Sequence, residues 1–89
     1  MGSLQVGQTV RLSFRQSRRV RLHPKYDFRV FAVRDSGDEG ITLVEASCPG
    51  LGSIRFRWDT RQPDDVLPIQ SAFINGHWYN VRYLDNGRA

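Results

Sequence analysis

The stretch that decides the fold class is AFINGHWYNVRY, residues 72–83. Within it, Asn75-Gly76 separates the apolar run of residues 72–74 from residues 77–83, in which Tyr79, Val81 and Tyr83 share one face. This dipeptide favours a type I′ turn, because both of its residues adopt positive φ at little cost. Side chains alternate between the two faces of a strand, so Trp78 and Arg82 share a face opposite to that of Val81. The stretch therefore predicts a β-hairpin with Trp78 on its outer face.

The same period of two recurs upstream. Residues 10–14 and 54–59 alternate between apolar and polar side chains, as expected of half-buried strands. Residues 26–33 and 41–47 flank the turn-forming residues 35–40 and predict a second hairpin. Residues 66–69 would add a short edge strand, since Pro68 cannot donate to a central ladder. The alternation predicts Val10, Leu12, Phe14, Ile54, Phe56 and Trp58 as inward-facing, and Arg11, Ser13, Arg55 and Arg57 as outward-facing.

No segment of this 89-residue chain keeps the apolar period of a helix over about ten residues. Short strands in one small domain predict an all-β fold, and closing the sheet into a barrel would remove its exposed edges. We therefore expect a single-domain barrel of about five to seven antiparallel strands, SH3-like by preference and OB-like as the second choice. The barrel is expected over residues 4–85, with flexible ends at 1–3 and 86–89.

Basic residues are concentrated in the first half of the chain. Residues 11–34 carry eight basic residues and one acid, a net charge of +7, whereas residues 35–89 carry a net charge of −3. A local concentration of positive charge attracts polyanions and steers them to the surface. Arginine accounts for 12 of the 13 basic residues. Its planar guanidinium group suits phosphate and stacks on bases, although a coding bias toward arginine is an alternative explanation.

These features predict a small basic module that binds DNA or RNA, mainly by phosphate-backbone contacts from the Arg-rich segment 15–29. An exposed Trp78 would stack a base or mark a protein interface. The alternative is a protein–protein interaction module or an assembly subunit, which would bind an acidic partner through the same basic surface and Trp78. An SH3-like fold and a phage origin both belong to this alternative. The candidate binding residues are Arg11, Arg15, Arg18, Arg19, Arg21, Lys25, Arg29, Arg55, Arg57, Trp78 and Arg82.

Phe56 and Trp58 lie next to arginines in the sequence, and two interpretations are open for these aromatic residues. If exposed, they would stack bases for roughly 1–3 kcal/mol each. If buried, they would belong to the core, beneath arginine side chains that extend to the solvent. The alternation of residues 54–59 favours the core.

The sequence points to a binding protein rather than an enzyme. His23 and His77 belong to no motif with a carboxylate, and Cys48 has no identifiable base, so a ribonuclease-type activity is the third interpretation. The acids of residues 35–39 match no calcium loop, and a soluble turn explains them. We therefore expect no catalytic residue, no cofactor and no metal.

The chain has no apolar run long enough to span a bilayer and no apolar region at its N-terminus. We therefore expect no membrane partner and a cytoplasmic protein, with association with the nucleoid or a virion as further options. A homodimer formed through an edge strand is left open, because an uncovered edge in so small a sheet invites pairing.

Overall fold

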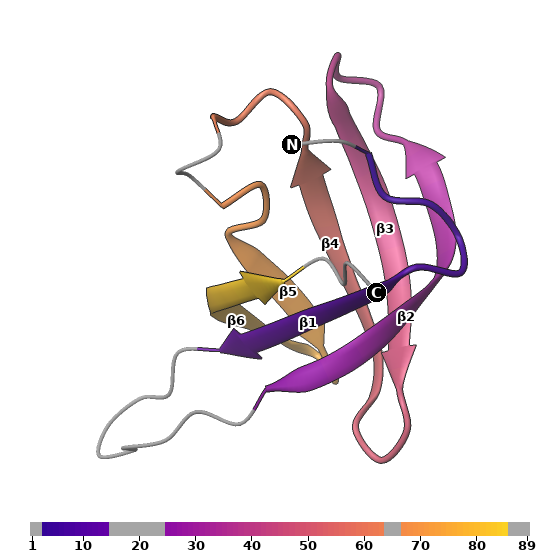
Figure 1. Ribbon diagram of the computed structural model, residues 1–89, viewed down its shortest axis with the longest axis vertical. Coiled ribbons are helices and arrows are strands. Elements are labelled where there is room, and N and C mark those ends of the chain that lie inside the picture. Colours follow the sequence, from indigo (N-terminus) through magenta and orange to yellow (C-terminus); the bar gives the residue numbers. More distant parts are fainter. Residues whose placement is uncertain (1–2, 15–24, 64–66, 86–89) are drawn as a thin grey trace.

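The computed structural model (Figure 1) describes residues 3–14, 25–63 and 67–85. These residues form antiparallel strands and no helix. Each strand pairs with its neighbours along the chain, and β6 pairs with β1, so the six strands make a closed ring. The prediction of a small all-β fold of antiparallel strands is confirmed. The strands are β1 (Thr9–Phe14), β2 (Tyr26–Asp35), β3 (Ile41–Cys48), β4 (Gly52–Asp59), β5 (Ser71–Ile74) and β6 (His77–Asp85).

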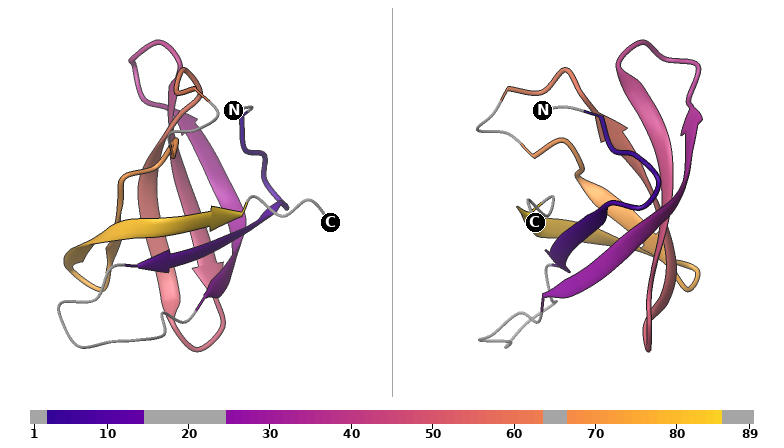
Figure 2. Two further views of the ribbon diagram at one scale, coloured as in Figure 1. Left: turned by 60° about the vertical axis from the view of Figure 1, so that its left-hand side comes forward. Right: turned by 45° about the vertical axis from the view of Figure 1, so that its right-hand side comes forward.

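The strands of the ring form two groups that differ in orientation. Figures 1 and 2 show β1 and β6 crossing the long strands β3 and β4 at a steep angle. The strand β2 joins the two groups, because Tyr26–Arg29 pairs with β1 and Arg29–Asp35 pairs with β3. The register of the second pairing shifts around Phe31, which is an extra residue relative to β3. A bulge of this kind bends a strand, so it allows β2 to pass from one group to the other.

Apolar side chains from every strand fill the interior of the ring. Phe56 and Trp58 are 2% and 0% exposed, so the core interpretation of these two residues is confirmed. Burying one large apolar side chain stabilises the fold by about 1.5–3 kcal/mol, so this core is the main source of stability. Its members are Leu4, Val10, Leu12, Phe14, Phe28, Val30, Val44, Ala46, Ile54, Phe56, Trp58, Ile69, Ala72, Ile74 and Val81.

The predicted C-terminal hairpin is present as β5 and β6. Asn75 and Gly76 have φ values of 50° and 87°, the positive values that a type I′ turn requires at both central positions. Val81 is buried, whereas Trp78 and Arg82 are exposed. The tight turn thus sets a register that directs Trp78 outward, as the alternation predicts.

Two predictions of strand geometry are wrong. The alternation predicts Ser13 on the outer face, but Ser13 is 3% exposed. The register between β1 and β6 shifts between Ser13 and Phe14, and this shift interrupts the alternation. Residues 67–69, the described part of the predicted edge strand, form no strand, and Pro68 and Ile69 are buried there. The described residues of the connection between β4 and β5 therefore contribute to the core without forming a strand.

The closed ring limits where a strand edge is accessible. Each described strand has a neighbour on both sides, and a homodimer formed through an edge strand stays a prediction.

Within the described ranges, the chain has no helix with the length and apolar character needed to cross a membrane.

Candidate functional site

Three side chains from neighbouring strands meet on the outer face of the sheet. Arg55 on β4, Phe73 on β5 and Trp78 on β6 are register partners across the three strands. The guanidinium carbon of Arg55 lies 5.0 Å from the centroid of the Phe73 ring. The Trp78 ring lies 5.2 Å from the same ring, centroid to centroid, at an interplanar angle of 59°. Cation–π and tilted aromatic contacts both stabilise such an arrangement. We term these three residues the outer stack.

The outer stack includes one large aromatic ring, that of Trp78, which is exposed to the solvent. Trp78 is 63% exposed, although Phe73 fixes its position from one side. Arg55 and Trp78 are both binding residues predicted from the sequence, and the structure brings them together through Phe73. Phe73 itself was missed. The signal that would have found it is the two-residue turn, which pairs Phe73 with Trp78 and so places the two side chains on one face.

A pocket lies beside Trp78, where β4 and β5 separate. The two strands are paired as far as Phe56 and Ala72, and the next backbone hydrogen bond joins Asp59 N to Pro68 O at 2.8 Å. The space between these contacts has a volume of about 280 Å³. We term it the Trp78 pocket. Its walls include Arg57, Asp59, Pro68, Gln70, Ser71 and Trp78.

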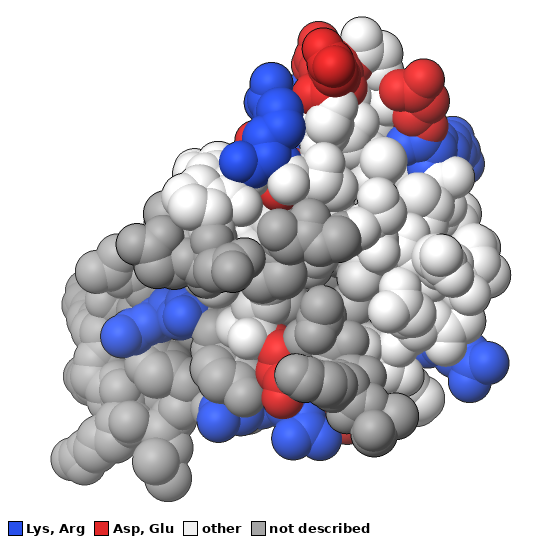
Figure 3. All heavy atoms as spheres, turned by 45° about the horizontal axis from the view of Figure 1, so that its top comes forward, with Lys and Arg blue, Asp and Glu red and all other residues white. Residues whose placement is uncertain are grey.

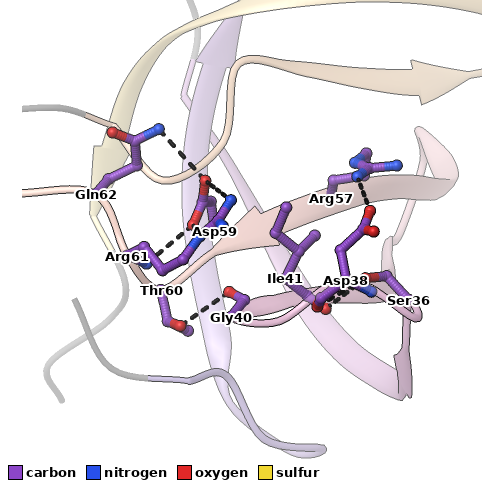
Figure 4. A network of polar contacts seen from close by, with 9 residues as sticks. All are labelled: Ser36, Asp38, Gly40, Ile41, Arg57, Asp59, Thr60, Arg61 and Gln62. Carbon is purple, nitrogen blue, oxygen red and sulfur yellow. Dashed lines mark hydrogen bonds and ion pairs between the residues drawn. The ribbon is translucent and has the colours of Figure 1, made fainter.

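The charged groups of the Trp78 pocket both have partners, which Figure 4 shows. Arg57 Nη2 donates to Asp38 Oδ2 at 3.1 Å. Asp59 Oδ1 accepts from Arg61 Nε at 3.1 Å and from Arg61 N at 2.9 Å, and Gln62 Nε2 donates to Asp59 Oδ2 at 3.4 Å. The hydrogen bond from the Arg61 side chain is the main cause that holds the pKa of Asp59 below its ordinary value of 3.8. The carboxylate is therefore ionised at neutral pH and balanced by Arg61.

Hydrogen bonds between the β2–β3 turn and the end of β4 fix another wall of the pocket. Thr60 donates to Gly40 O through both its backbone N and its Oγ1, each at 2.8 Å. Ser36 Oγ donates to Ile41 O at 2.7 Å. Ile41 lines the Trp78 pocket, so its position is set by the fold before any ligand binds.

The predicted basic residues on β1 and β2 form a different part of the surface. Arg11 contacts Asp27 at two points, from Nε to Oδ1 at 2.7 Å and from Nη2 to Oδ2 at 3.2 Å. The side-chain hydrogen bond from Arg11 lowers the pKa of Asp27 below its ordinary value of 3.8. Arg29 on β2 and Lys25, just before β2, are exposed. Asp27 thus balances the charge of Arg11, which contributes less to a positive surface than the sequence indicates.

The strongest part of the predicted basic surface lies outside the described residues, since it consists of Arg15, Arg18, Arg19 and Arg21. The described residues carry eight basic and seven acidic side chains. Figure 3 shows the two signs next to one another on the face in view. The described part of the chain is therefore close to neutral, and most of the net charge of +4 belongs to residues outside it.

The structure describes two of the residues considered for catalysis, His77 and Cys48. His77 is exposed, and its ring lies 6.4 Å from that of Tyr79, centroid to centroid. His23 lies outside the described residues. Cys48 is half-buried, with its Sγ 3.6 Å from the carbonyl oxygen of Pro49. In the described ranges, no three His, Cys, Asp or Glu residues are grouped where they would hold a metal ion.

Comparisons with known proteins identify no relative. No protein-family model matches this sequence, and neither a curated protein nor a solved structure matches it significantly. The candidate site therefore rests on its own geometry and chemistry.

Proposed function

We propose that this protein binds nucleic acid, with phosphate contacts from the Arg-rich segment 15–29 and from the arginines of β4 around the outer stack. The observation that carries the proposal is the outer stack, in which Phe73 fixes a Trp78 ring that is 63% exposed while Arg55 packs on the same Phe73. An exposed and fixed aromatic ring is suited to stacking on a base. A guanidinium group beside it supplies the hydrogen bonds that a phosphate accepts.

The charge distribution supports the same proposal. The chain has a net charge of +4, and residues 11–34 have a net charge of +7. A protein that neutralises phosphates releases counterions, so its affinity falls steeply as the salt concentration rises. Because the sequence has no base-reading motif, the contacts are expected to involve phosphates and base faces with little dependence on nucleotide sequence.

The order of the strands supports the SH3-like form of the fold over the OB-like form. An OB-fold is a five-stranded Greek-key barrel, in which one strand returns by a long connection to a non-consecutive neighbour. Here the pairing follows chain order from β1 to β6 and then returns to β1. An SH3-like barrel is therefore the finer fold class that we propose.

Fluorescence anisotropy tests the proposed function. Labelled single-stranded and double-stranded oligonucleotides would be titrated with the protein at about 50 and about 200 mM salt. If four phosphates are contacted, the affinity should fall on the order of 50- to 150-fold between these salt concentrations. The absence of binding to both oligonucleotides at the lower salt concentration would overturn the proposal.

Matched variants locate the phosphate contacts. Replacing Arg18 and Arg19 together with alanine should make the slope of log affinity against log salt less steep by about 1.4–1.8, because two phosphate contacts are lost. Arg34→Ala is the control, since Arg34 lies outside the segment 15–29 and near the end of β2, which β3 separates from β4. The control should leave the slope nearly unchanged.

The alternative function is a protein interaction module that uses the same surface. Ion pairs between the chain's own residues, such as Arg57 with Asp38 and Arg11 with Asp27, show that its arginines do bind carboxylates. A protein that binds no oligonucleotide at low salt but captures an acidic protein, and loses it in Trp78→Ala, would fit this alternative.

A further inference from the structure

The Trp78 pocket combines an aromatic wall with side chains that form hydrogen bonds. Trp78 lines one side, and Ile41 and Pro68 add apolar surface. Gln70, just before β5, and Ser71, its first residue, also line the pocket. Both side chains can donate and accept hydrogen bonds. Arg57, Asp59 and Gln62 complete the lining, so the pocket is more polar than the predominantly apolar sites of drug-sized ligands. An aromatic wall beside hydrogen-bonding groups suits a ring compound that carries polar atoms of its own.

The size and rigidity of the pocket favour a single ring system. Its volume of about 280 Å³ lies just below the roughly 300–1,000 Å³ found for sites of drug-sized ligands. Two backbone hydrogen bonds of 2.8 Å each, from Asp59 to Pro68 and from Thr60 to Gly40, hold its walls. A ligand therefore enters a formed site and loses little affinity to reorganisation of the protein.

Positive charge lies beside the pocket. Arg57 lines the pocket, and Arg55, two residues earlier on β4, packs on Phe73. Both arginines are exposed. The contact of Arg57 with Asp38 engages Nη2, and a guanidinium group has five N–H donors in all. An aromatic wall flanked by two guanidinium groups matches the base and the phosphates of a nucleotide.

We infer that the Trp78 pocket receives one unpaired base, which stacks on Trp78 while its flanking phosphates contact Arg55 and Arg57. This inference rests on the proposed function and assigns its ligand class. A paired base is stacked inside a duplex, and bringing it out costs a few kcal/mol. The protein therefore selects single-stranded over double-stranded nucleic acid. Since Gln70 and Ser71 both donate and accept, the pocket takes any of the bases.

The test compares two single strands that have the same number of phosphates. One is a labelled oligothymidine, and the other is a strand of the same length whose residues lack bases. We expect wild-type protein to bind oligothymidine on the order of tenfold more tightly than the abasic strand, with similar salt slopes for the two. The corresponding duplex should bind more weakly than oligothymidine at the same salt concentration.

Two variants assign the preference to the pocket. Trp78→Ala should bind both strands with similar affinity, because the stacking wall is lost while the cations remain. Phe31→Ala is the matched control, since Phe31 is also an exposed aromatic, at 49%, but lies on β2, separated from β4 by β3. This control should keep the preference for oligothymidine. The wild-type comparison needs no variant, so the test does not depend on the folding of Trp78→Ala.

The outcomes separate this inference from the proposed function. Equal binding of oligothymidine and the abasic strand by wild-type protein, or a preference that persists in Trp78→Ala, would overturn the inference and leave salt-dependent nucleic-acid binding standing. A failure of all these strands to bind at about 50 mM salt would overturn both. A preference that is present in wild type and in Phe31→Ala but lost in Trp78→Ala would support the inference.

Discussion

Trp78 and Phe73 face each other across the β5–β6 pairing, with their ring centroids 5.2 Å apart. The pair lies one position beyond the residues that close the Asn75-Gly76 turn. Because a two-residue turn of this type defines the register of the strands that it joins, the turn determines which side chain stands beside Trp78. The position of an exposed ring in the candidate site thus depends on two residues in the adjacent turn.

Iodide should quench the fluorescence of Trp78 and leave that of Trp58 nearly unchanged. Trp78 is 63% exposed, whereas Trp58 is 0% exposed in the core. The variant Trp78→Phe should therefore lose most of the iodide quenching seen in wild-type protein. Its free energy of unfolding, measured in urea, should stay within about 0.5 kcal/mol of wild type, as is usual for surface substitutions. Strong residual quenching in Trp78→Phe would mean that Trp58 is accessible.

Gly40→Ala should destabilise the protein more than Gly50→Ala does. Both glycines have a positive φ, of 79° and 89°, so alanine is strained at either position by about 1–2 kcal/mol. A Cβ at Gly40 would also lie 2.6 Å from Cγ and Cδ of Arg61, whereas a Cβ at Gly50 would have no neighbour within 4 Å. Gly50→Ala is thus a control for backbone strain alone, and urea unfolding of both variants measures the difference.

A second substitution shows whether the side chain of Arg61 is responsible. In an Arg61→Ala background, Gly40→Ala and Gly50→Ala should destabilise the protein by similar amounts, because the obstructing side chain is absent. A difference of the same size in both backgrounds would assign the effect to another contact of Gly40.

The strands could be predicted from the sequence because each strand must place apolar side chains inward at every second position. Phe56 and Trp58 follow this rule, and both are buried in the core. The rule fails at Ser13, where a register shift between β1 and β6 interrupts the alternation. It also fails at Ile69, which is fully buried outside any strand. Both failures depend on contacts between distant segments, which a local pattern does not contain.

The candidate site could be predicted in part for the same reason. The period of two places Trp78 and Arg55 on outer faces, although Phe73 between them was missed. The Trp78 pocket could not be predicted, because it depends on where β4 and β5 separate. The far side of that separation is closed by the hydrogen bond from Asp59 N, at the end of β4, to Pro68 O in the irregular connection nine residues later. The pairing of Arg57 with Asp38 is likewise a consequence of the β3–β4 register.

The hydrogen bonds to Asp59 should make stability depend on pH in the acid range. The Arg61 side chain holds the pKa of Asp59 in the folded protein below the ordinary value of 3.8. The folded state therefore releases this proton more readily than the unfolded state does. The resulting stabilisation is complete above about pH 5 and is lost as the pH falls through the folded pKa. Asp59→Asn should be less stable than wild type at about pH 6, and the difference should shrink toward about pH 2.5.

Urea unfolding of wild type and Asp59→Asn at several pH values measures this effect. Asp27, whose pKa Arg11 lowers in the same way, is unchanged in both proteins, so its contribution cancels in the comparison. A difference in the free energy of unfolding that stays constant from about pH 6 to about pH 2.5 would contradict the role assigned to the Arg61 hydrogen bonds.

Two threonine-to-valine substitutions should change stability in opposite directions. Thr42 Oγ1 is buried and has no hydrogen-bond partner among the described residues, and a buried hydroxyl without a partner is unfavourable by about 1–3 kcal/mol. Thr42→Val removes this hydroxyl and keeps the β-branched shape that suits a strand. Thermal and urea unfolding should show a gain of about 0.5–1 kcal/mol.

Thr60→Val is the matched variant, because Thr60 Oγ1 donates to Gly40 O at 2.8 Å. Removing this donor should lower the free energy of unfolding by about 1 kcal/mol. The backbone hydrogen bond from Thr60 N to Gly40 O remains, which limits the loss. Since both variants make the same chemical change in half-buried threonines, a shift of the same sign in both would show that the hydrogen-bond partner of the hydroxyl does not decide the outcome.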